Sequence, residues 1–415
     1  MAETSEQLLE ERRKRVLDAA ALKVPDRVPI FLPISAFGAR YAGITVKEAF
    51  ELENVGKWHD INEKLLLEYQ PDLFLGPISF DMEANAIVGN KLYKWPGNGV
   101  DPDRSFQFVE GEYMKAEEYD AFLDNPGDFI FRTYVPRTNS NLQGLSTMPP
   151  LLSLVGGFAG GVYSSFSNPA VVEALETIIK AAKLGTQYFM AGLPFIPRMQ
   201  AHGFPPLLGF GGMAPFDFIS DFLRGLKGAT LDMYRCPDKL LAAQQKLLPY
   251  LIDSSVAMGR MMGTPLCFGA LHRGSDGFMS LKQFETFYWP GLKTVLLAMI
   301  DAGLTPFVFW EGSWDQRLEY LRELPKGKVV GWFDRTNLFR AKEVIGDTMC
   351  ICGDMPLSLL RTGTPEQVRA YAKKLIDVVG KGGGFIMGSN TVLDDAKPEL
   401  VKVWVDFTRE YGMYR

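Results

Sequence analysis

The stretch LCFGALHRGSDG, residues 266–277, joins a short apolar run to a loop that holds a histidine, an arginine, two glycines and an aspartate. Such a run, ending abruptly in polar and glycine residues, is typical of a buried strand that leads into a loop. The segment SLKQFETFYWPGLKTVLLAMIDAG at 280–303 follows and has the pattern of an amphipathic helix. The order strand, loop, helix predicts one unit of an α/β fold.

The same unit recurs on both sides of this stretch. Further apolar runs lie at residues 28–34, 72–78, 205–211, 306–312, 328–334, 349–355 and 384–390. Helical segments separate the later runs, and one of them opens with Thr364 as a helix N-cap and Pro365 in the first turn. Alternation of eight strands with helices predicts a parallel α/β fold closed as a (β/α)8 TIM barrel.

Three segments depart from this alternation. The first 20 residues are polar and helix-forming, which predicts an N-terminal helical extension. Residues 91–114 alternate apolar and polar side chains around a Pro-Gly-Asn-Gly turn, which predicts a hairpin excursion. Residues 115–200 are interpreted as an insertion between the second and third strands, either a surface cover or a lid over the barrel mouth. Residues 1–415 are therefore expected to form a single barrel domain.

The composition narrows the function classes. Hydrophobic residues make up 47% of the 415 residues, and the net charge is −5 without a long basic block, so neither disorder nor nucleic-acid binding is expected. There is no apolar run of about 18 residues and no secretory signal pattern, so no membrane span is expected. The four cysteines form no CxxC motif, which favours a reducing cytoplasm.

Chemistry in such barrels is performed at the carboxyl ends of the strands. His272 and Glu311 directly follow the fourth and fifth runs, and Asp81 lies just past the second. A carboxylate such as Glu311 is costly to bury without a cation or donor, which favours a functional role. His272 could equally be a structural histidine, and Cys350 and Cys352 could pack as small apolar residues. Polar residues also end the last three runs: Asp334, Asp354 and Asn390.

Several segments together resemble the uroporphyrinogen decarboxylase superfamily. The resemblance runs from about Arg27 to the C-terminus outside residues 115–200, and it implies a (β/α)8 barrel. The stretches that carry it are RVPIFLPISAFGARYAG at 27–43, PPLLGFGGMAPFDFISDFLRG at 205–225, GFMSLKQFETFYWPGLK at 277–293, GDMPLSLLRTGTPEQV at 353–368 and GGGFIMGSNTVLDDAKPELV at 382–401.

One branch of this superfamily decarboxylates a tetrapyrrole without a cofactor. The resemblance places one of its two loop arginines on Arg40 and its catalytic aspartate near Asp81. Its tyrosine falls near Asp221 and its last histidine on Asn390, so these two side chains are replaced.

The other branch consists of zinc-dependent methyltransferases that exchange methyl groups with a corrinoid on a partner protein. Its His-x-Cys ligands fall here on Phe309 and Glu311, and its last cysteine falls on Asn390. A replacement zinc site built from His272, Glu311 and Cys352 is therefore the hypothesis for this chain.

We expect methyl transfer from a small methoxylated or methylthio compound to a corrinoid carried by a partner protein. Glu311 and His272 would activate the leaving group, with Asp81 as the third catalytic candidate. Two alternatives stay open: a cofactor-free decarboxylase or lyase, and a non-catalytic barrel that binds a ligand. The resemblance also allows a homodimer. The candidates for substrate binding are Arg40, Tyr41, Asp217, Phe309, Trp310 and Asn390.

Overall fold

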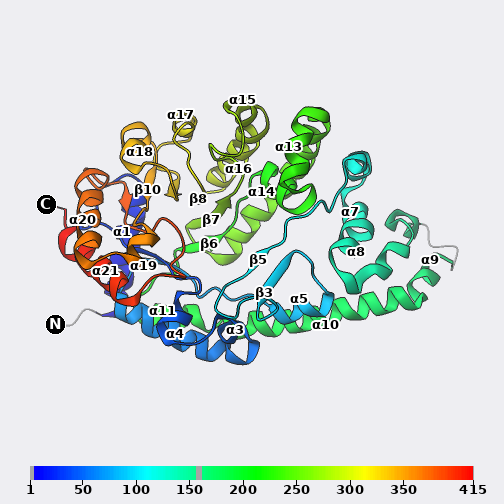
Figure 1. Cartoon of the computed structure of the whole chain (residues 1–415), viewed down its shortest axis with the longest axis horizontal. Helices are drawn as coiled ribbons and strands as arrows, with labels where there is room; N and C mark the ends of the chain where they lie inside the picture. Colours follow the sequence, from blue (N-terminus) through cyan, green and yellow to red (C-terminus); the bar gives the residue numbers. More distant parts are fainter. Residues whose placement is uncertain (1–3, 156–160, 415) are drawn as a thin grey trace.

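The computed structural model of the protein describes residues 4–155 and 161–414. Each of the eight apolar runs contains a strand, although five of the strands (β1, β2, β6, β10 and β11) have only two or three residues and are much shorter than their runs (Figure 1). The strands are β1 (Phe31–Pro33), β2 (Leu73–Leu75), β6 (Leu208–Phe210), β7 (Leu266–Leu271), β8 (Thr305–Trp310), β9 (Val330–Phe333), β10 (Cys350–Cys352) and β11 (Phe385–Ile386).

These strands pair only in parallel. β1 pairs with β2, and the other six form one sheet in the order β11-β10-β9-β8-β7-β6. An isolated parallel bridge between Ile30 and Met387 joins the two sheets at β1 and β11. Within the described ranges, no ladder of hydrogen bonds joins β2 to β6. The prediction of an α/β fold with a parallel sheet is confirmed.

One apolar cluster shows which face of each strand points inward. It collects side chains from all eight strand segments. Phe307 and Phe309 of β8 belong to this cluster, whereas Val308 and Trp310 pack in a second cluster with the surrounding helices. Because side chains alternate along a strand, this pattern fixes the inward face of β8 and of its neighbours. The inward side chains include Phe31, Leu75, Leu266, Trp332, Cys352 and Ile386.

Helices connect the strands on the outside of the six-stranded sheet (Figure 1). At the start of α20, the Thr364 side chain accepts a hydrogen bond from the backbone N–H of Gln367, and the Gln367 side-chain oxygen accepts one from the backbone N–H of Thr364, as the N-cap prediction requires. The connecting helices include α14 (Pro237–Met262), α16 (Trp289–Asp301), α18 (Leu338–Ile345), α20 (Pro365–Val378) and α21 (Pro398–Tyr411).

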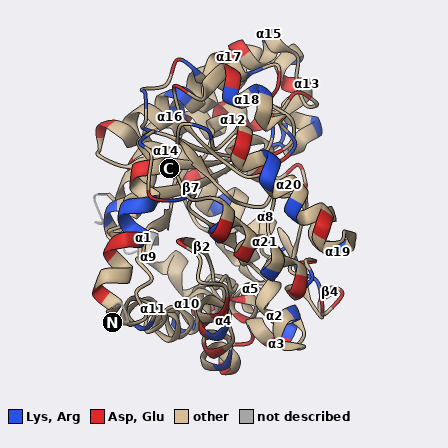
Figure 2. Cartoon of the chain, turned by 90° about the vertical axis from the view of Figure 1, so that its left-hand side faces the viewer, with Lys and Arg blue, Asp and Glu red and all other residues tan. Residues whose placement is uncertain are grey.

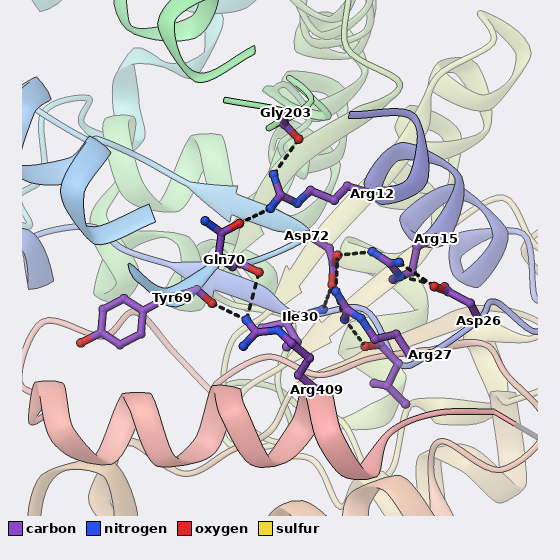
Figure 3. Close-up of polar contacts among 11 residues, drawn as sticks. Arg12, Arg15, Asp26, Arg27, Ile30, Tyr69, Gln70, Asp72, Gly203 and Arg409 are labelled. Carbon is purple, nitrogen blue, oxygen red and sulfur yellow. Dashed lines mark hydrogen bonds and ion pairs between the residues drawn. The ribbon is translucent and has the colours of Figure 1, made fainter. Parts of the chain in front are cut away.

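The N-terminal helix α1 (Ser5–Ala20) lies at the amino ends of the strands, where its apolar residues join the inner cluster. Asp72, just before β2, connects α1 to the segments that precede β1 and β2 through hydrogen bonds (Figure 3). Its carboxylate accepts hydrogen bonds from Arg15 at 2.7 Å, from Arg27 at 2.7 and 2.8 Å and from the backbone of Ile30 at 2.9 Å. The network joins α1 to the starts of β1 and β2.

The segment between β2 and β6 holds a small sheet and several helices. β3 (Tyr93–Pro96) pairs antiparallel with β5 (Gln107–Phe108), and β4 (Gly99–Val100) lies next to β3. α10 (Pro169–Gly192) packs along α5 (Met82–Val88) and along the 3-10 helix Ser140–Thr147. Part of the predicted insertion, residues 156–160, lies outside the described residues. The role of the insertion as a lid stays a prediction.

Charged residues are interspersed over the face drawn in Figure 2. None of the described helices combines the length and the apolar character that a bilayer crossing requires.

Candidate functional site

His272 and Glu311 lie at neighbouring strand ends. Leu271 of β7 pairs with Trp310 of β8, and His272 and Glu311 are the residues that directly follow this pair. Both side chains point to the inner side of the sheet. His272 lies four residues after Phe268 and Glu311 lies two residues after Phe309, and both phenylalanines point inward. Burial raises the pKa of Glu311, and the positive charge of His272 opposes that rise, so the two groups also interact electrostatically. The structure therefore brings the predicted imidazole and carboxylate together.

Asp221 holds the ring of His272. The Nδ1 atom of His272 lies 2.5 Å from Oδ2 of Asp221, whose other oxygen accepts a hydrogen bond from Arg273 Nε at 3.1 Å. Burial by itself lowers the pKa of His272, but the hydrogen bond with Asp221 and the nearby carboxylates outweigh it and raise the pKa to about 9. His272 is therefore an imidazolium at neutral pH, with Nε2 as the ring nitrogen left for a ligand.

Asp217 holds the backbone of the same loop. Its carboxylate accepts hydrogen bonds from the backbone N–H of His272 and of Arg273, each at 3.0 Å, and from the Tyr288 hydroxyl at 2.7 Å. Asp217 is fully buried, and burial raises its pKa to about 6 against the opposing charge of His272. Its oxygens accept hydrogen bonds within the chain, so Asp217 positions the loop, and its role in substrate binding stays a prediction.

Asp217 and Asp221 come from one continuous helical segment. Asp217 lies in α12 (Pro215–Phe218), and Asp221 lies in the π-helical turn Ile219–Leu223 that follows. Residues four apart on a helix project from the same side. This spacing lets one element fix both the backbone and the ring of His272.

An aromatic floor lies below these polar groups. The ring of Phe309 is 4.3 Å from that of Trp332, and Phe268 is 6.1 Å from Trp332. Phe268 and Phe309 are partly exposed, although they belong to the inner cluster. The floor can therefore contact an apolar or aromatic ligand.

Asp334 and Asn390 continue the polar rim. Asn390 Nδ2 donates to one oxygen of Asp334 at 3.1 Å, and the backbone N–H of Gly312 donates to the other at 3.1 Å. The charge of Asp334 contributes to the raised pKa of Glu311. The site thus combines an imidazolium, a carboxyl group of raised pKa and an apolar floor.

Comparison with known proteins identifies the family. A family model described as "Uroporphyrinogen decarboxylase (URO-D)" matches residues 156–411. The chain belongs to the URO-D family. A curated relative, the uroporphyrinogen decarboxylase of Syntrophotalea carbinolica, is 24% identical over 219 residues, which are 50% of this chain. The chain matches only 61% of that relative's length.

A solved methyltransferase from Methanosarcina mazei shares the fold of this URO-D family protein. The two superpose with a TM-score of 0.61, and the match covers 96% of this chain and 98% of the methyltransferase. The sequence identity is 16%, so the likeness concerns the fold alone.

The predicted zinc ligands of this URO-D family protein do not form a donor set. Cys352 is fully buried in the inner cluster, and burial raises the pKa of its thiol well above the ordinary value, whereas zinc binds a thiolate. Across residues 4–155 and 161–414, no group of three or more His, Cys, Asp or Glu side chains has the arrangement of a metal site. The residues present do not fit zinc.

Trp310 lies on the opposite face from the site. It is fully buried among the outer helices, with its ring 4.7 Å from that of Trp314. The period-two alternation that turns Phe309 inward turns Trp310 outward. Trp310 does not line the aromatic floor, contrary to the expectation for a substrate-binding residue.

Three further candidates have partners elsewhere. Asp81 caps α5 by accepting a hydrogen bond from Ala84 at 2.9 Å, and burial raises its pKa. Tyr41 donates a hydrogen bond to Glu68 at 2.5 Å. Arg40 donates to the Asp394 carbonyl and to the Asp395 carboxylate, each at 3.1 Å. No hydrogen bond or ion pair of the described residues links these three to the group formed by His272, Asp221 and Glu311.

Asp221, Arg273 and Trp332 are parts of the site that the sequence reasoning did not select. The signal that could have found Asp221 is its spacing of four residues from Asp217 after the third strand. Trp332 could have been found from the alternation in the sixth run once the inward face was known.

Proposed function

We propose that this URO-D family protein is a methyltransferase that removes a methyl group from a small methoxylated or methylthio compound. The acceptor in this proposal is a corrinoid carried by a partner protein. We further propose that the eight strands close into a (β/α)8 barrel, with the substrate at the carboxyl ends of β7 and β8. The observation that carries the proposal is the hydrogen bond by which Asp221 holds the His272 ring at the edge of the floor formed by Phe309 and Trp332; the raised pKa of His272 agrees with it.

The chemistry requires an acid because an ether oxygen or a thioether sulfur is a poor leaving group. In the proposed step, the bond between the methyl carbon and the heteroatom breaks, and its electron pair stays on the heteroatom. The heteroatom takes the proton of His272 Nε2, which leaves a neutral imidazole that regains a proton from solvent. The corrinoid, when bound, supplies the nucleophile that takes the methyl group.

The positions of the other groups suit this role. Asp221 keeps the imidazole oriented and stabilises its charge, as a carboxylate does for a catalytic histidine. The floor suits an aromatic or otherwise apolar substrate. Glu311 lies next to His272, and its negative charge stabilises the protonated form of the His272 ring.

A second candidate, decarboxylation of a carboxylated substrate, is favoured by a different recess. A cavity of about 680 Å³ is lined in part by Arg40, Arg104 and Asp395. Three guanidinium groups converge on the Asp395 carboxylate, from Arg40 at 3.1 Å, Arg104 at 3.5 Å and Arg361 at 3.6 Å. Guanidinium groups bind carboxylates, so Arg40 and Arg104 would hold a carboxylated substrate in this cavity, which Asp103, Asp394 and Asp395 also line.

One assay separates the two candidates. The full chain is incubated with a panel of methoxylated and methylthio aromatic compounds and a free, reduced corrinoid. We expect methylated corrinoid by absorbance and the demethylated compound by mass spectrometry. His272→Gln should lower the rate at least a hundredfold, the range expected for loss of a general acid.

The matched control is His202→Gln, because His202 pairs with Glu63 at 2.6 Å outside the site. This variant should keep the full rate. Release of CO2 from a carboxylated tetrapyrrole, unchanged by His272→Gln and with no methyl transfer, would replace the first candidate by the second. Absence of turnover in both assays would favour the non-catalytic binding protein.

A further inference from the structure

The long helix α10 carries a second apolar face that no part of the described chain covers. Its buried face packs against the rest of the molecule through Val171, Ala174, Ala181 and Tyr188. Large apolar side chains are nevertheless exposed along the same helix. They include Val172 at 36%, Ile179 at 54%, Phe189 at 62% and Met190 at 57% of their surface, and Leu193 at 47% just past its end.

Most of these exposed side chains follow a coiled-coil spacing, together with Leu175, which is half-buried against the cluster that contains Leu142 and Leu145. The positions 172, 175, 179, 182, 186, 189 and 193 are separated alternately by three and four residues, and Thr186 is the one polar member. This spacing places them in one seam along the helix, which we call the α10 seam. The seam spans 21 intervals of about 1.5 Å, or roughly 32 Å of helix. Apolar residues that are scattered over a surface have no regular spacing, whereas residues that pack against a partner helix repeat every three and four positions.

The charges beside the seam indicate the direction of a partner helix. Glu173 and Glu176 lie in the first half of α10, and Lys180 and Lys183 lie closer to its middle. Within the described chain, none of the four forms an ion pair with another residue. In the heptad of the seam Glu176 and Lys183 both occupy e positions. A parallel second copy would set Glu176 beside the uncharged Val171, whereas an antiparallel copy sets e positions side by side and brings Glu176 near Lys183.

The same antiparallel arrangement also pairs the seam with itself. When Ile179 lies opposite Ala182 of the second copy, Val172 lies opposite Phe189 and Leu175 lies opposite Thr186. Each layer then combines a larger and a smaller side chain, which suits close packing. A groove of about 480 Å³ lies beside the central layer and can receive a charged or polar side chain of the second copy. It is lined by Ile87, Ile179 and Leu184 and by the polar side chains of Glu176, Lys180, Lys183 and Gln187.

We propose that the α10 seam is a self-association surface through which two copies of this chain pair their α10 helices antiparallel. In Figure 1, α10 runs along the lower edge of the molecule, away from β7 and β8. The site at His272 and Glu311 would therefore stay accessible in the pair. This inference does not depend on the chemistry proposed for that site.

The test is the mass of the full chain in solution over a range of concentrations, by sedimentation velocity or light scattering. We expect a dimer. The double variant Ile179→Glu/Phe189→Glu should raise the dissociation constant at least thirtyfold, as expected when central residues of an interface are lost. Its circular dichroism spectrum should stay unchanged, because both side chains are exposed. The matched control is Tyr250→Glu, since Tyr250 is 62% exposed on α14.

Charge exchange tests the direction of pairing without relying on a loss of apolar surface. Glu176→Lys and Lys183→Glu should each weaken the dimer, and the two together should restore it. A chain that is monomeric at every concentration overturns the proposal. A dimer that the seam variants leave intact, or a pair of charge variants that fails to restore association, overturns it as well.

Discussion

His272 meets two carboxylates, one at its ring and one at its backbone. Burial alone would lower the pKa of a histidine, as it does for His59, which lacks such a partner at its ring. Asp221 reverses the effect at His272 because the charge-assisted hydrogen bond favours the imidazolium. The acid function proposed for His272 therefore depends on Asp221 as much as on the histidine.

Asp221→Asn should move the alkaline limb of the pH–rate profile. The folded-state pKa of His272, about 9, lies above the ordinary value. The protonated ring stabilises the folded state and supplies the acid. Both contributions are complete below about pH 6.5, and both are lost as the pH rises through about 9. Without the Asp221 charge we expect the pKa to fall by at least about one unit. NMR titration of the His272 ring and the pH dependence of kcat both measure this shift.

Glu63→Gln serves as the control for that prediction, because Glu63 contacts His202 in the same way outside the site. It should leave the alkaline limb in place. A limb that stays near pH 9 in Asp221→Asn would show that another group provides the proton.

Glu311→Gln should lower kcat about a hundredfold and leave the midpoint of thermal unfolding unchanged. Removing its negative charge weakens the stabilisation of the His272 imidazolium, and the exposed Glu311 side chain contributes little to packing. Steady-state kinetics and a thermal melt measure the two quantities. Glu319→Gln, on an exposed side chain of α17 (Leu318–Leu321), is the matched control. Full activity in Glu311→Gln would remove this residue from the mechanism.

At the scale of elements, apolar runs located all eight strands because burial leaves a direct trace in the sequence. The position of a side chain along its strand was less visible. Cys352 lies on the inward face, as the alternation from Cys350 predicts, but it is the last residue of β10 and packs inside the core. Two residues later, Asp354 turns to accept a hydrogen bond from Tyr371 of α20 at 2.9 Å.

The partner of His272 could not be predicted for a different reason. Asp221 lies 51 residues earlier in the chain, on a helical turn whose orientation depends on how α12 packs against α14 and α16. The resemblance placed the family's tyrosine near this position, yet nothing in the sequence showed that an aspartate there would contact the histidine. Contacts between distant segments follow from tertiary packing and leave no local pattern.

The contact of α1 with β1 and β2 gives a prediction for stability. Asp72→Ala should lower the free energy of unfolding by about 3–5 kcal/mol, because it leaves the buried Arg27 and the Ile30 N–H without their acceptor. Urea titration followed by circular dichroism measures the change. Asp26→Ala removes the more exposed carboxylate bound to Arg15 and should cost about 1 kcal/mol or less. An equal loss of unfolding free energy in Asp72→Ala and Asp26→Ala would show that the ion pairs of Asp72 stabilise the fold no more than a surface ion pair does.

At the scale of the whole molecule, the eight strands share one core but not one continuous ladder. Side chains from every strand segment meet in the inner cluster, while the backbone pairing is divided between a two-stranded and a six-stranded sheet. The bridge at Ile30 and Met387 links them on one side. Side-chain packing therefore holds β2 against β6 where, in the described parts of the chain, backbone hydrogen bonds do not.

This division predicts where the two parallel sheets open most easily. Strands that pair on both sides, such as β7 and β8, lose their backbone hydrogen bonds only when two neighbours separate. β2 and β6 each pair on one side, so less free energy is needed to expose their amides. We expect peptides that cover residues 73–75 and 208–210 to exchange hydrogen at least tenfold faster than those that cover 266–271 and 305–310. Mass spectrometry of the full chain in deuterated buffer measures both sets in one experiment, which cancels differences in global stability. Equal protection at all four peptides would mean that β2 and β6 are joined by hydrogen bonds in solution, and that the two sheets are continuous.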